Sequence, residues 1–532
     1  MTTSIFTYAV LAAPAAFGLT WAVGRSDQWW DPRRTERAGA VAGWFGVAVA
    51  TVAAGTVAVS GPMASPMIGA EGLGLSVRLD PLSVVMLPMI TLLAVVIFRY
   101  SCTYLDGDAR QGVFLGRLAL TLMSVEVLVL AGNLATLVGA WIATSLALHR
   151  LLLFYPDRRA AVVAARKKFV AARVGDTFLI VGAVLLYHRF GTGDLTAVFE
   201  AAPGAARGGW GIGSVELAAL CIAVAAVLKS AQFPTHGWLV EVMETPTPVS
   251  ALLHAGILNA GPFLALRMAF VLDHSAAATA LLIAVGGFTA VFASVVLLTQ
   301  PSVKVALGYS SAAHMGFMLM VCGMGLFPAA LLHLVAHSFY KAHAFLSSGS
   351  VVDEIRAAPV ALPRRLGHPA RLLSSGAIAL AIYVILALAW GTRLAAEPML
   401  LAIGAVLVLG TTQIIGPTLD SDGPVAGTFR AGVLATAVTL SFFTLETGMR
   451  WILGAAVPHH GPRTIVHAAL VVILVTAFTV VIAFQLMSPA RPPSRWRRRL
   501  AVHLRNGLYA NAAFDRAVGS LRIPTSTAGQ AR

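Results

Sequence analysis

A lysine in the middle of the chain is followed closely by a proline and a glycine, an arrangement suited to ion transport through a membrane. Lys229 lies in an apolar run, with Pro234 and Gly237 directly after it. Proline removes a backbone donor and glycine weakens a helix, so the pattern predicts a broken transmembrane helix here. An ammonium inside a span costs at least ~2.5–3.5 kcal/mol, and such groups usually belong to ion or proton pathways. A lysine that only snorkels to the interface is the alternative explanation.

The segment 331-LLHLVAHSFYKAHAFLSSGS-350 carries a second row of chemical groups. His333, His337 and Lys341 recur every four residues, so they share one helix face over ~12 Å. A histidine pair at this spacing can bind zinc, but no glutamate lies between them as in HExxH and no third ligand is evident. We therefore predict a proton relay and no metal in this chain. Polar groups that hydrogen-bond between packed helices are the alternative.

Lysine and acid usage supports proton transfer. Only five of the 38 basic residues are lysines, yet the cations inside the key spans are lysines. A buried lysine can release its proton, whereas arginine stays protonated. Two carboxylates are candidates for pairing with Lys229: Asp176 opens the sixth span and Glu126 lies well inside the fourth. Asp176 could instead cap its helix.

Composition defines the class of protein. Of 532 residues 58% are hydrophobic and only 11% are charged, against about 25% charged in soluble domains. We therefore expect a polytopic membrane protein in a lipid bilayer. The net charge of +15 comes from short basic clusters between apolar runs, which is typical of cytoplasmic loops and requires no nucleic acid. The three cysteines are far apart, so neither a disulfide framework nor a metal cluster is indicated.

Apolar runs of spanning length predict fifteen transmembrane helices. They lie near 4–24, 38–60, 82–99, 113–132, 134–154, 174–189, 214–243, 247–270, 278–298, 302–324, 327–350, 371–391, 395–416, 431–453 and 465–487. The basic segments 25–37, 155–173, 356–371 and 491–505 each follow an odd-numbered span, so all four lie on one side. The positive-inside rule makes that side the cytoplasm. The basic tail is expected to lie on the membrane surface, to bind a partner, or to be solvated.

Three segments carry a resemblance to a known family. KSAQFPTHGWLVEVMETPTPVSALLHAG, VKVALGYSSAAHMGFMLM and HLVAHSFYKAHAFLSSGSVV resemble the antiporter-like membrane subunits of respiratory complex I, of the NuoL type, and of Mrp antiporters. The likeness extends over residues 75–350. It implies that Lys229 is the central lysine of the broken helix. The other residues that the resemblance assigns to the ion pathway are His254, His333, His337, Lys341, Asp176 and Lys304.

Two departures narrow the resemblance. The glutamate that these subunits carry on the fifth helix is missing from 140-AWI-142, and the later exit lysine and long lateral helix are absent. In this respect the chain is similar to DabB, the membrane subunit type of DAB-type inorganic carbon transporters. That likeness implies a bacterial inner-membrane location and a peripheral DabA-type partner with a carbonic-anhydrase-like zinc site. It also implies cation flow that drives the hydration or uptake of CO2 or bicarbonate.

We therefore expect an all-α polytopic fold of about 14–15 transmembrane helices, with inverted five-helix repeats and a broken helix. The expected divisions are N-terminal helices in 1–112, repeats in 113–270 and 278–416, C-terminal helices in 417–490 and a basic cytoplasmic tail in 491–532. A second broken helix is expected in the later repeat, with Gly391 as its candidate. The expected function is a proton- or sodium-conducting transporter subunit, not an enzyme, without a cofactor of its own. The alternatives are an ion-pumping subunit of a complex I, hydrogenase-like or Mrp assembly, and a structural anchor for a partner enzyme.

Overall fold

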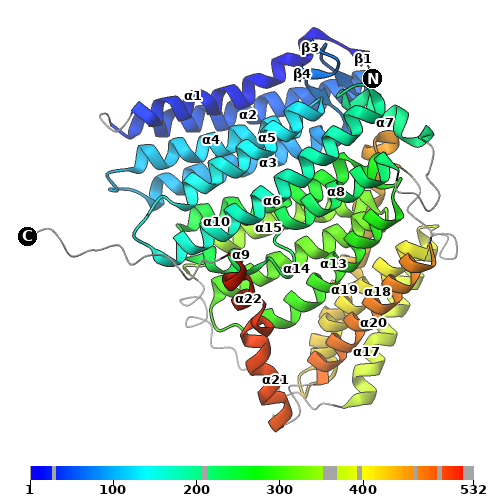
Figure 1. The fold of residues 1–532 in the computed structure, drawn as a ribbon. Coiled ribbons are helices and arrows are strands. Elements are labelled where there is room, and N and C mark those ends of the chain that lie inside the picture. The colour runs from blue at the N-terminus through cyan, green and yellow to red at the C-terminus, as the bar shows by residue number, and fades with distance from the viewer. Residues whose placement is uncertain are drawn as a thin grey trace, which may run out of the picture.

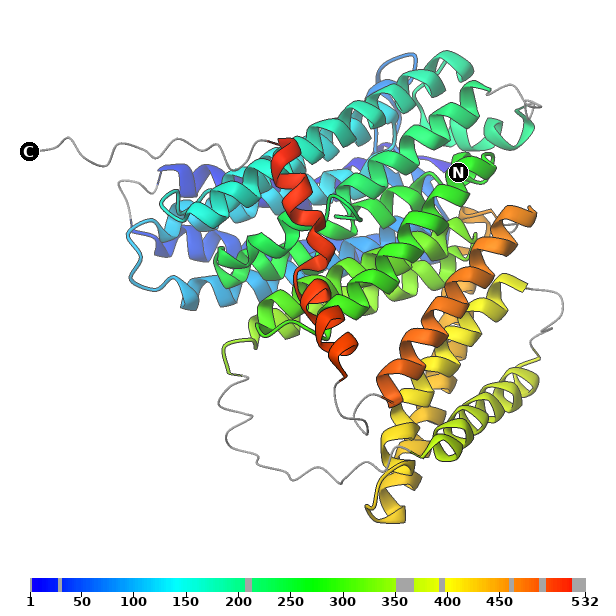
Figure 2. The ribbon, with the colours of Figure 1, turned by 60° about the horizontal axis from the view of Figure 1, so that its bottom comes forward.

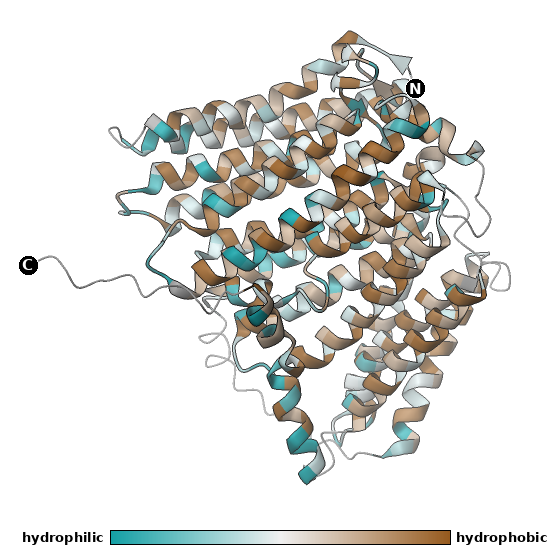
Figure 3. Cartoon of the chain, viewed as in Figure 1, coloured by the Kyte–Doolittle hydropathy of each residue, from teal (hydrophilic) through white to brown (hydrophobic). Residues whose placement is uncertain are grey.

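Long helices packed side by side make up nearly the whole molecule (Figure 1). The computed structural model describes residues 2–26, 31–205, 213–350, 368–391, 398–458, 464–487 and 494–518. Brown, hydrophobic residues cover most of the helix length, and teal, hydrophilic ones gather toward the helix ends and on the last helices (Figure 3). This distribution is typical of helices that lie in a lipid bilayer.

The main bundle contains α1 to α15. Its elements are α1 (Ala12–Ser26), α2 (Arg33–Ser60), α3 (Pro81–Tyr104), α4 (Gln111–Leu130), α5 (Leu134–Leu152), α6 (Arg159–Phe190), α7 (Leu195–Ala201), α8 (Ser214–Lys229), α9 (Gly237–Glu241), α10 (Thr247–Ala255), α11 (Ala260–Arg267), α12 (Ala269–Leu272), α13 (Ala276–Leu297), α14 (Val303–Gly323) and α15 (Phe327–Leu346). One continuous set of buried apolar side chains joins most of these helices.

The C-terminal helices form a second group. They are α17 (Pro369–Ala389), α18 (Pro398–Leu419), α19 (Val425–Leu453), α20 (Ile465–Met487), α21 (Arg495–Arg505) and α22 (Ala510–Val518). Figure 2 shows α17 to α20 standing at an angle to the main bundle, while α21 and α22, in red, run across its cyan and green helices.

Short strands occur only near the N-terminus in the described part of the chain. β1 (Thr2–Thr3), β2 (Met63–Ala64) and β5 (Arg78–Leu79) pair in the order β1-β2-β5, and β3 (Ile68–Ala70) pairs with β4 (Leu73–Leu75) as a hairpin. Together they cover one end of α1 to α3 (Figure 1).

The predicted spans all have a helical counterpart. Among the described residues, thirteen helices are long and apolar enough to cross a membrane. The two remaining predicted spans coincide with α8, which has only 16 residues before the break, and with α15, whose histidines and lysine lower its hydropathy. The all-α polytopic fold with a broken helix is therefore confirmed, while the repeat boundaries stay predictions.

One span begins much earlier than predicted. We expected a basic loop over 155–173 and a span over 174–189, but α6 is helical from Arg159 onward. Asp176 therefore lies inside a helix, and the idea that it caps one is wrong. The prediction failed because Lys167 and Lys168, which indicated a solvated loop, are both buried in protein contacts.

Those contacts also position the C-terminal tail. The Lys167 Nζ donates to the Glu241 Oε1 at 2.6 Å and to the Asn511 Oδ1 at 3.0 Å, and it forms an ion pair with Asp515. Asn511 and Asp515 belong to α22, and Glu241 is the last residue of α9. The described part of the tail therefore docks on its own chain, beside the second piece of the broken helix. It also lies at the same end of the bundle as the start of α6 (Figure 1).

A buried ionic cluster ties the other end of the bundle together. Asp80 caps α3 by accepting from the Ser83 backbone N–H at 2.9 Å, and it pairs with the Arg78 Nε at 2.8 Å and the Arg267 Nη1 at 2.5 Å. Arg267 also donates to the Val129 carbonyl at the end of α4. Burial alone would raise the pKa of Asp80, but the guanidiniums of Arg267 and Arg78 hold it well below its usual range.

We expect Asp80→Asn to lower the free energy of unfolding by about 3–5 kcal/mol at neutral pH, because it leaves Arg267 buried without its counter-charge. The measurement is thermal unfolding of the purified chain in detergent. Because the pKa of Asp80 is lower in the folded protein than in the unfolded chain, Asp80 stabilises the fold above about pH 4, and this stabilisation declines as the pH falls further. The difference in free energy of unfolding between wild type and Asp80→Asn should therefore narrow below about pH 4.

The matched control is Asp106→Asn, since Asp106 is exposed at the opposite end of α3. It should change the melting temperature little. Equal melting temperatures for Asp80→Asn and wild type would contradict the proposed role of the cluster.

Candidate functional site

Lys229 lies at the end of α8, where the helix stops. The chain leaves helical geometry over residues 230–236 and resumes as α9 at Gly237, so the predicted interruption at Pro234 and Gly237 is present. The Lys229 side chain is buried. Its Nζ donates to the Trp141 carbonyl at 3.1 Å and lies 4.2 Å from the centroid of the Trp141 ring. A desolvated cation–π contact of this kind contributes about 2 kcal/mol.

Asp176 is the carboxylate that acts on Lys229. It pairs with the Arg173 Nη2 at 2.5 Å one turn away on α6, and it interacts electrostatically with Lys229. Trp141 and Asp176 thus surround the lysine, although the fifth helix lacks the glutamate found in the resembling subunits.

Glu126 lies in a different place. Its Oε1 is 3.9 Å from where a Cβ on Gly46 of α2 would lie, and the Thr91 side chain of α3 adjoins the same point. Neither carboxyl oxygen of Glu126 has a hydrogen-bond partner in the part of the chain that the structure describes. Of the two predicted acids, Asp176 rather than Glu126 interacts with Lys229, and the transport roles of both acids stay predictions.

A second buried lysine lies near Lys229, and the sequence reasoning missed it. The Lys168 Nζ donates to the Ser145 carbonyl at 2.6 Å and to the Ser145 hydroxyl at 2.9 Å. A small cavity is lined by both lysines and by Leu253, the neighbour of His254. The basic residues beside Lys168 in the sequence predict a solvated loop, so the sequence pattern alone does not identify this lysine as buried.

The relay row of α15 faces α14 and α10. The Lys341 Nζ donates to the Ser310 hydroxyl at 2.8 Å and to the Leu307 carbonyl at 3.1 Å. His254, on α10, stacks on Phe345 of α15 with ring centroids 4.3 Å apart and interacts electrostatically with Lys341. His254 thus lies between the cavity beside Lys229 and the row on α15.

His314 of α14 completes this row. Its Nδ1 lies 2.9 Å from the Nε2 of His333, and its ring centroid is 5.0 Å from that of His337. Sequence reasoning missed His314 because it has no periodic partner on its own helix. Only the packing of α14 on α15 brings it to the other two histidines.

Lys304 lies at the start of α14, away from the histidines. Its Nζ donates to the Thr247 hydroxyl at 3.1 Å, and its side chain is half-buried. Leu307, which accepts from Lys341, follows within one turn. Lys304 is therefore at the end of α14 that leads to Lys341.

A second helix break adjoins His254. The helix α10 stops at Ala255, and α11 begins at Ala260 after Gly256 and a short 3-10 turn. Asn259 in this turn donates to the Ala255 carbonyl at 2.8 Å and to the Ser338 hydroxyl of α15 at 2.7 Å. Gly391, our candidate for a second break, instead follows the end of α17, with a φ of +75°.

The arrangement suits proton exchange more than ligand binding. Lys229, His254, His337 and Lys341 are all buried. His254 lies on the side of Lys341 that faces the cavity beside Lys229, and His337 lies one turn before Lys341 on α15. Both ring nitrogens of His254 and His337 lack a hydrogen-bond partner among the described residues. Such imidazoles can accept and pass on protons through water.

Three of these histidines could in principle hold a metal. One ring nitrogen from each of His314, His333 and His337 lies within 4.8 Å of the others, and imidazole is a common ligand for zinc. The expectation that the histidine pair lacks a third ligand is therefore wrong, because α14 supplies His314. Lys341 interacts electrostatically with His314 and His337, which opposes a second cation there. Our expectation that this chain holds no metal stays a prediction.

Comparison with known proteins gives the family. Residues 131–406 match the family described as NADH:quinone oxidoreductase/Mrp antiporter, transmembrane region, and residues 68–115 match the N-terminal region of complex I chain 5. The fold is similar to the Mrp complex from Dietzia sp. DQ12-45-1b, with a TM-score of 0.53 and 24% identity over 96% of this chain and 57% of that one. The chain therefore belongs to the complex I and Mrp antiporter-like family.

Its relatives define the group within that family. The chain is 39% identical over 456 residues to the probable inorganic carbon transporter subunit DabB2 of Halothiobacillus neapolitanus, covering 84% of this chain and 80% of that protein. It is 43% identical over 279 residues to the probable inorganic carbon transporter subunit DabB of Hydrogenovibrio crunogenus, covering 52% of this chain and 53% of that protein. The chain is accordingly a DabB-type subunit, and the resemblance found in its sequence is confirmed.

Proposed function

We propose that this chain conducts protons as the membrane subunit of an energy-coupled inorganic carbon transporter. The observation that carries the proposal is the buried Lys229 at a helix break, held by Trp141 and acted on by Asp176. Maintaining an ammonium there is costly unless its protonation changes during work.

The chemistry of the path favours protons over sodium ions. Apart from the Asp176 carboxylate, the buried titratable groups on the path from Lys229 to Lys341 are nitrogen bases, namely Lys168, Lys229, His254, His337 and Lys341. Sodium is a hard cation, and hard cations are held by several oxygen ligands. Amines and imidazoles instead bind and release protons.

In this proposal the proton is released when Asp176 and Lys229 move apart. While the Asp176 carboxylate lies near, it stabilises the ammonium form of Lys229. Separation of the two groups favours release of the proton, which His254 and then His337 and Lys341 receive. Lys229 and Lys341 repel each other when both are charged. Protonation of either lysine therefore makes protonation of the other less favourable.

The carbon chemistry itself belongs to a partner in this proposal. The relatives are named as subunits of inorganic carbon transporters. The partner that the resemblance implies, a subunit of the DabA type carrying zinc, would hydrate CO2 or bind bicarbonate. Proton flow through this chain would supply the energy.

An ion-translocating subunit of a complex I, hydrogenase-like or Mrp assembly is the second candidate. The family match and the likeness to the Mrp complex favour it. The partner that copurifies with the chain distinguishes the two: a zinc protein supports carbon transport, and quinone- or hydrogenase-type subunits support the alternative.

Substitutions of Lys229 test the relay. Lys229→Met keeps the side chain's length but removes its proton, and we expect carbon-dependent uptake to fall by about 100-fold, the lower range for loss of a proton-transferring group. Lys229→Arg should fail as well, because guanidinium does not release its proton at useful pH. Uptake of labelled inorganic carbon by cells that contain the whole complex measures both.

Membrane levels and partner binding must match wild type for this comparison. If Lys229 only anchors or packs the helix, Lys229→Arg should keep its uptake activity, because arginine anchors at least as well as lysine. Full uptake with Lys229→Arg would therefore reject the proton-relay role.

We further propose that the protein lies in a bacterial inner membrane. The end of the bundle that carries the start of α6 and the helices α21 and α22 would then face the cytoplasm. In a chain without native cysteines, Asp157→Cys and Val502→Cys should react with an impermeant maleimide only after the cells are opened, because both lie at that end. Ile68→Cys, in the strand cover at the opposite end, should react in intact cells. Reaction of Asp157→Cys and Val502→Cys from different sides would contradict this topology.

A further inference from the structure

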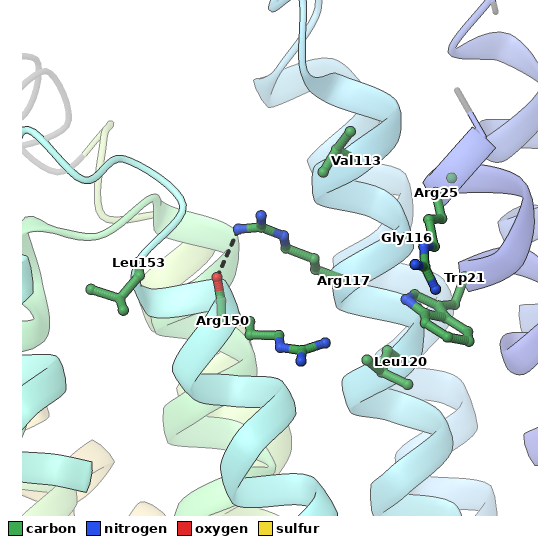
Figure 4. Close-up of a pocket in the computed structure, with 9 residues that line it drawn as sticks. Trp21, Arg25, Val113, Gly116, Arg117, Leu120, Arg150 and Leu153 are labelled. Carbon is green, nitrogen blue, oxygen red and sulfur yellow. Dashed lines mark hydrogen bonds between the residues drawn. The ribbon is translucent and has the colours of Figure 1, made fainter. Parts of the chain in front are cut away.

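A cavity of about 550 Å³ opens between α1, α4 and α5, apart from the relay. Three arginines line it, one from each helix: Arg25, Arg117 and Arg150. In Figure 4 Arg150 reaches from α5 toward α4, and Arg25 folds back beside Trp21 of α1. Arg117 donates to the Arg150 carbonyl at 2.9 Å and so satisfies one of the free carbonyls at the end of α5.

The cavity has positive charge without a matching acid. Arg117 is half-buried, and the charges of Arg110 and Arg150 act on it. In the described part of the chain no carboxylate forms an ion pair with Arg25, Arg117 or Arg150. Arg25 and Arg150 are exposed and only Arg117 is partly desolvated. Three like charges at one cavity still repel one another, so an anion bound among them would be stabilised.

The remaining walls of the cavity are apolar or tightly packed. Trp21, Val113, Leu120 and Leu153 line it alongside the arginines. Gly24 and Gly116 let α1 and α4 approach closely at its floor, since a Cβ on Gly24 would lie 2.8 Å from the Gly116 Cα. The site therefore presents charge together with a surface suited to hydrocarbon.

Its depth matches the headgroup layer. Arg25 and Arg150 are close to the ends of α1 and α5, and Arg117 is six residues into α4, or ~9 Å at 1.5 Å per residue. Only 33% of the apolar stretch of α1 is buried inside the protein, so its outer face meets lipid. A tryptophan at this level is typical of a membrane interface.

We propose that this cavity binds the phosphate headgroup of one anionic phospholipid, with an acyl chain along Trp21 and Leu120. The three guanidiniums hold the phosphate oxygens, and the apolar wall holds the chain. A free oxyanion such as phosphate or bicarbonate shares the charge but gains nothing from the wall. The proposal does not depend on the ion pathway.

Native mass spectrometry of the full chain in detergent tests this, with phosphatidylglycerol as the probe and phosphatidylcholine of the same acyl chains as the comparison. Wild type should retain one phosphatidylglycerol preferentially. Arg25→Gln with Arg150→Gln leaves the Arg117 hydrogen bond intact and should weaken that binding about 30-fold, from roughly 1 kcal/mol per arginine near the membrane surface.

Arg166→Gln is the matched control, because Arg166 is exposed on the same end of the bundle but outside the cavity. It should change binding less than about twofold, since it removes an arginine that does not contact the lipid. If the double variant does not fold, Arg150→Gln alone should weaken binding about fivefold on the same scale. Unchanged retention in the folded variant would overturn the proposal, as would displacement of the lipid by millimolar inorganic phosphate or bicarbonate.

Discussion

The rest of the structure depends on keeping the charge of Lys229 inside a membrane helix. The insertion cost of at least ~2.5–3.5 kcal/mol must be offset locally. The Trp141 carbonyl and ring do so from α5, and the Asp176 carboxylate does so from α6. Close packing brings α6 to α8: a Cβ on Gly182 would lie 3.2 Å from the Ala218 carbonyl. Small residues at helix contacts in membranes allow such an approach.

The broken helix connects this group to the rest of the molecule. Its second piece, α9, begins at Gly237, whose Cα packs so closely on Asn511 of α22 that a side chain would collide with it. Glu241 at the other end of α9 accepts a hydrogen bond directly from the Asn511 side chain of α22, and Lys167 donates to both residues. Movement of α22 would therefore be felt at α9 and in the non-helical segment after Lys229. This contact joins the C-terminal helix α22 to the piece of chain that follows Lys229.

How far the sequence predicts the structure depends on whether a feature is local. The helices, the break at Pro234 and the row His333, His337 and Lys341 follow from hydropathy, backbone chemistry and a period of four, all within single helices. His314 and Lys168 were missed because packing between helices gives them their neighbours. The start of α6 was predicted wrongly for the same reason. The run of basic residues that contains Lys167 indicates a solvated loop, and only the folded structure brings Glu241 and Asp515 to that lysine.

The most direct test of the account is proton flow through Lys341. The chain and its partner are reconstituted in liposomes that contain a pH-sensitive dye, with bicarbonate present and sodium absent, and an acid-outside gradient is applied. The account predicts acidification of the interior that Lys341→Met abolishes, with His343→Gln as the matched control, since His343 is exposed on the same helix. Equal acidification with Lys341→Met, or a requirement for sodium, would contradict it.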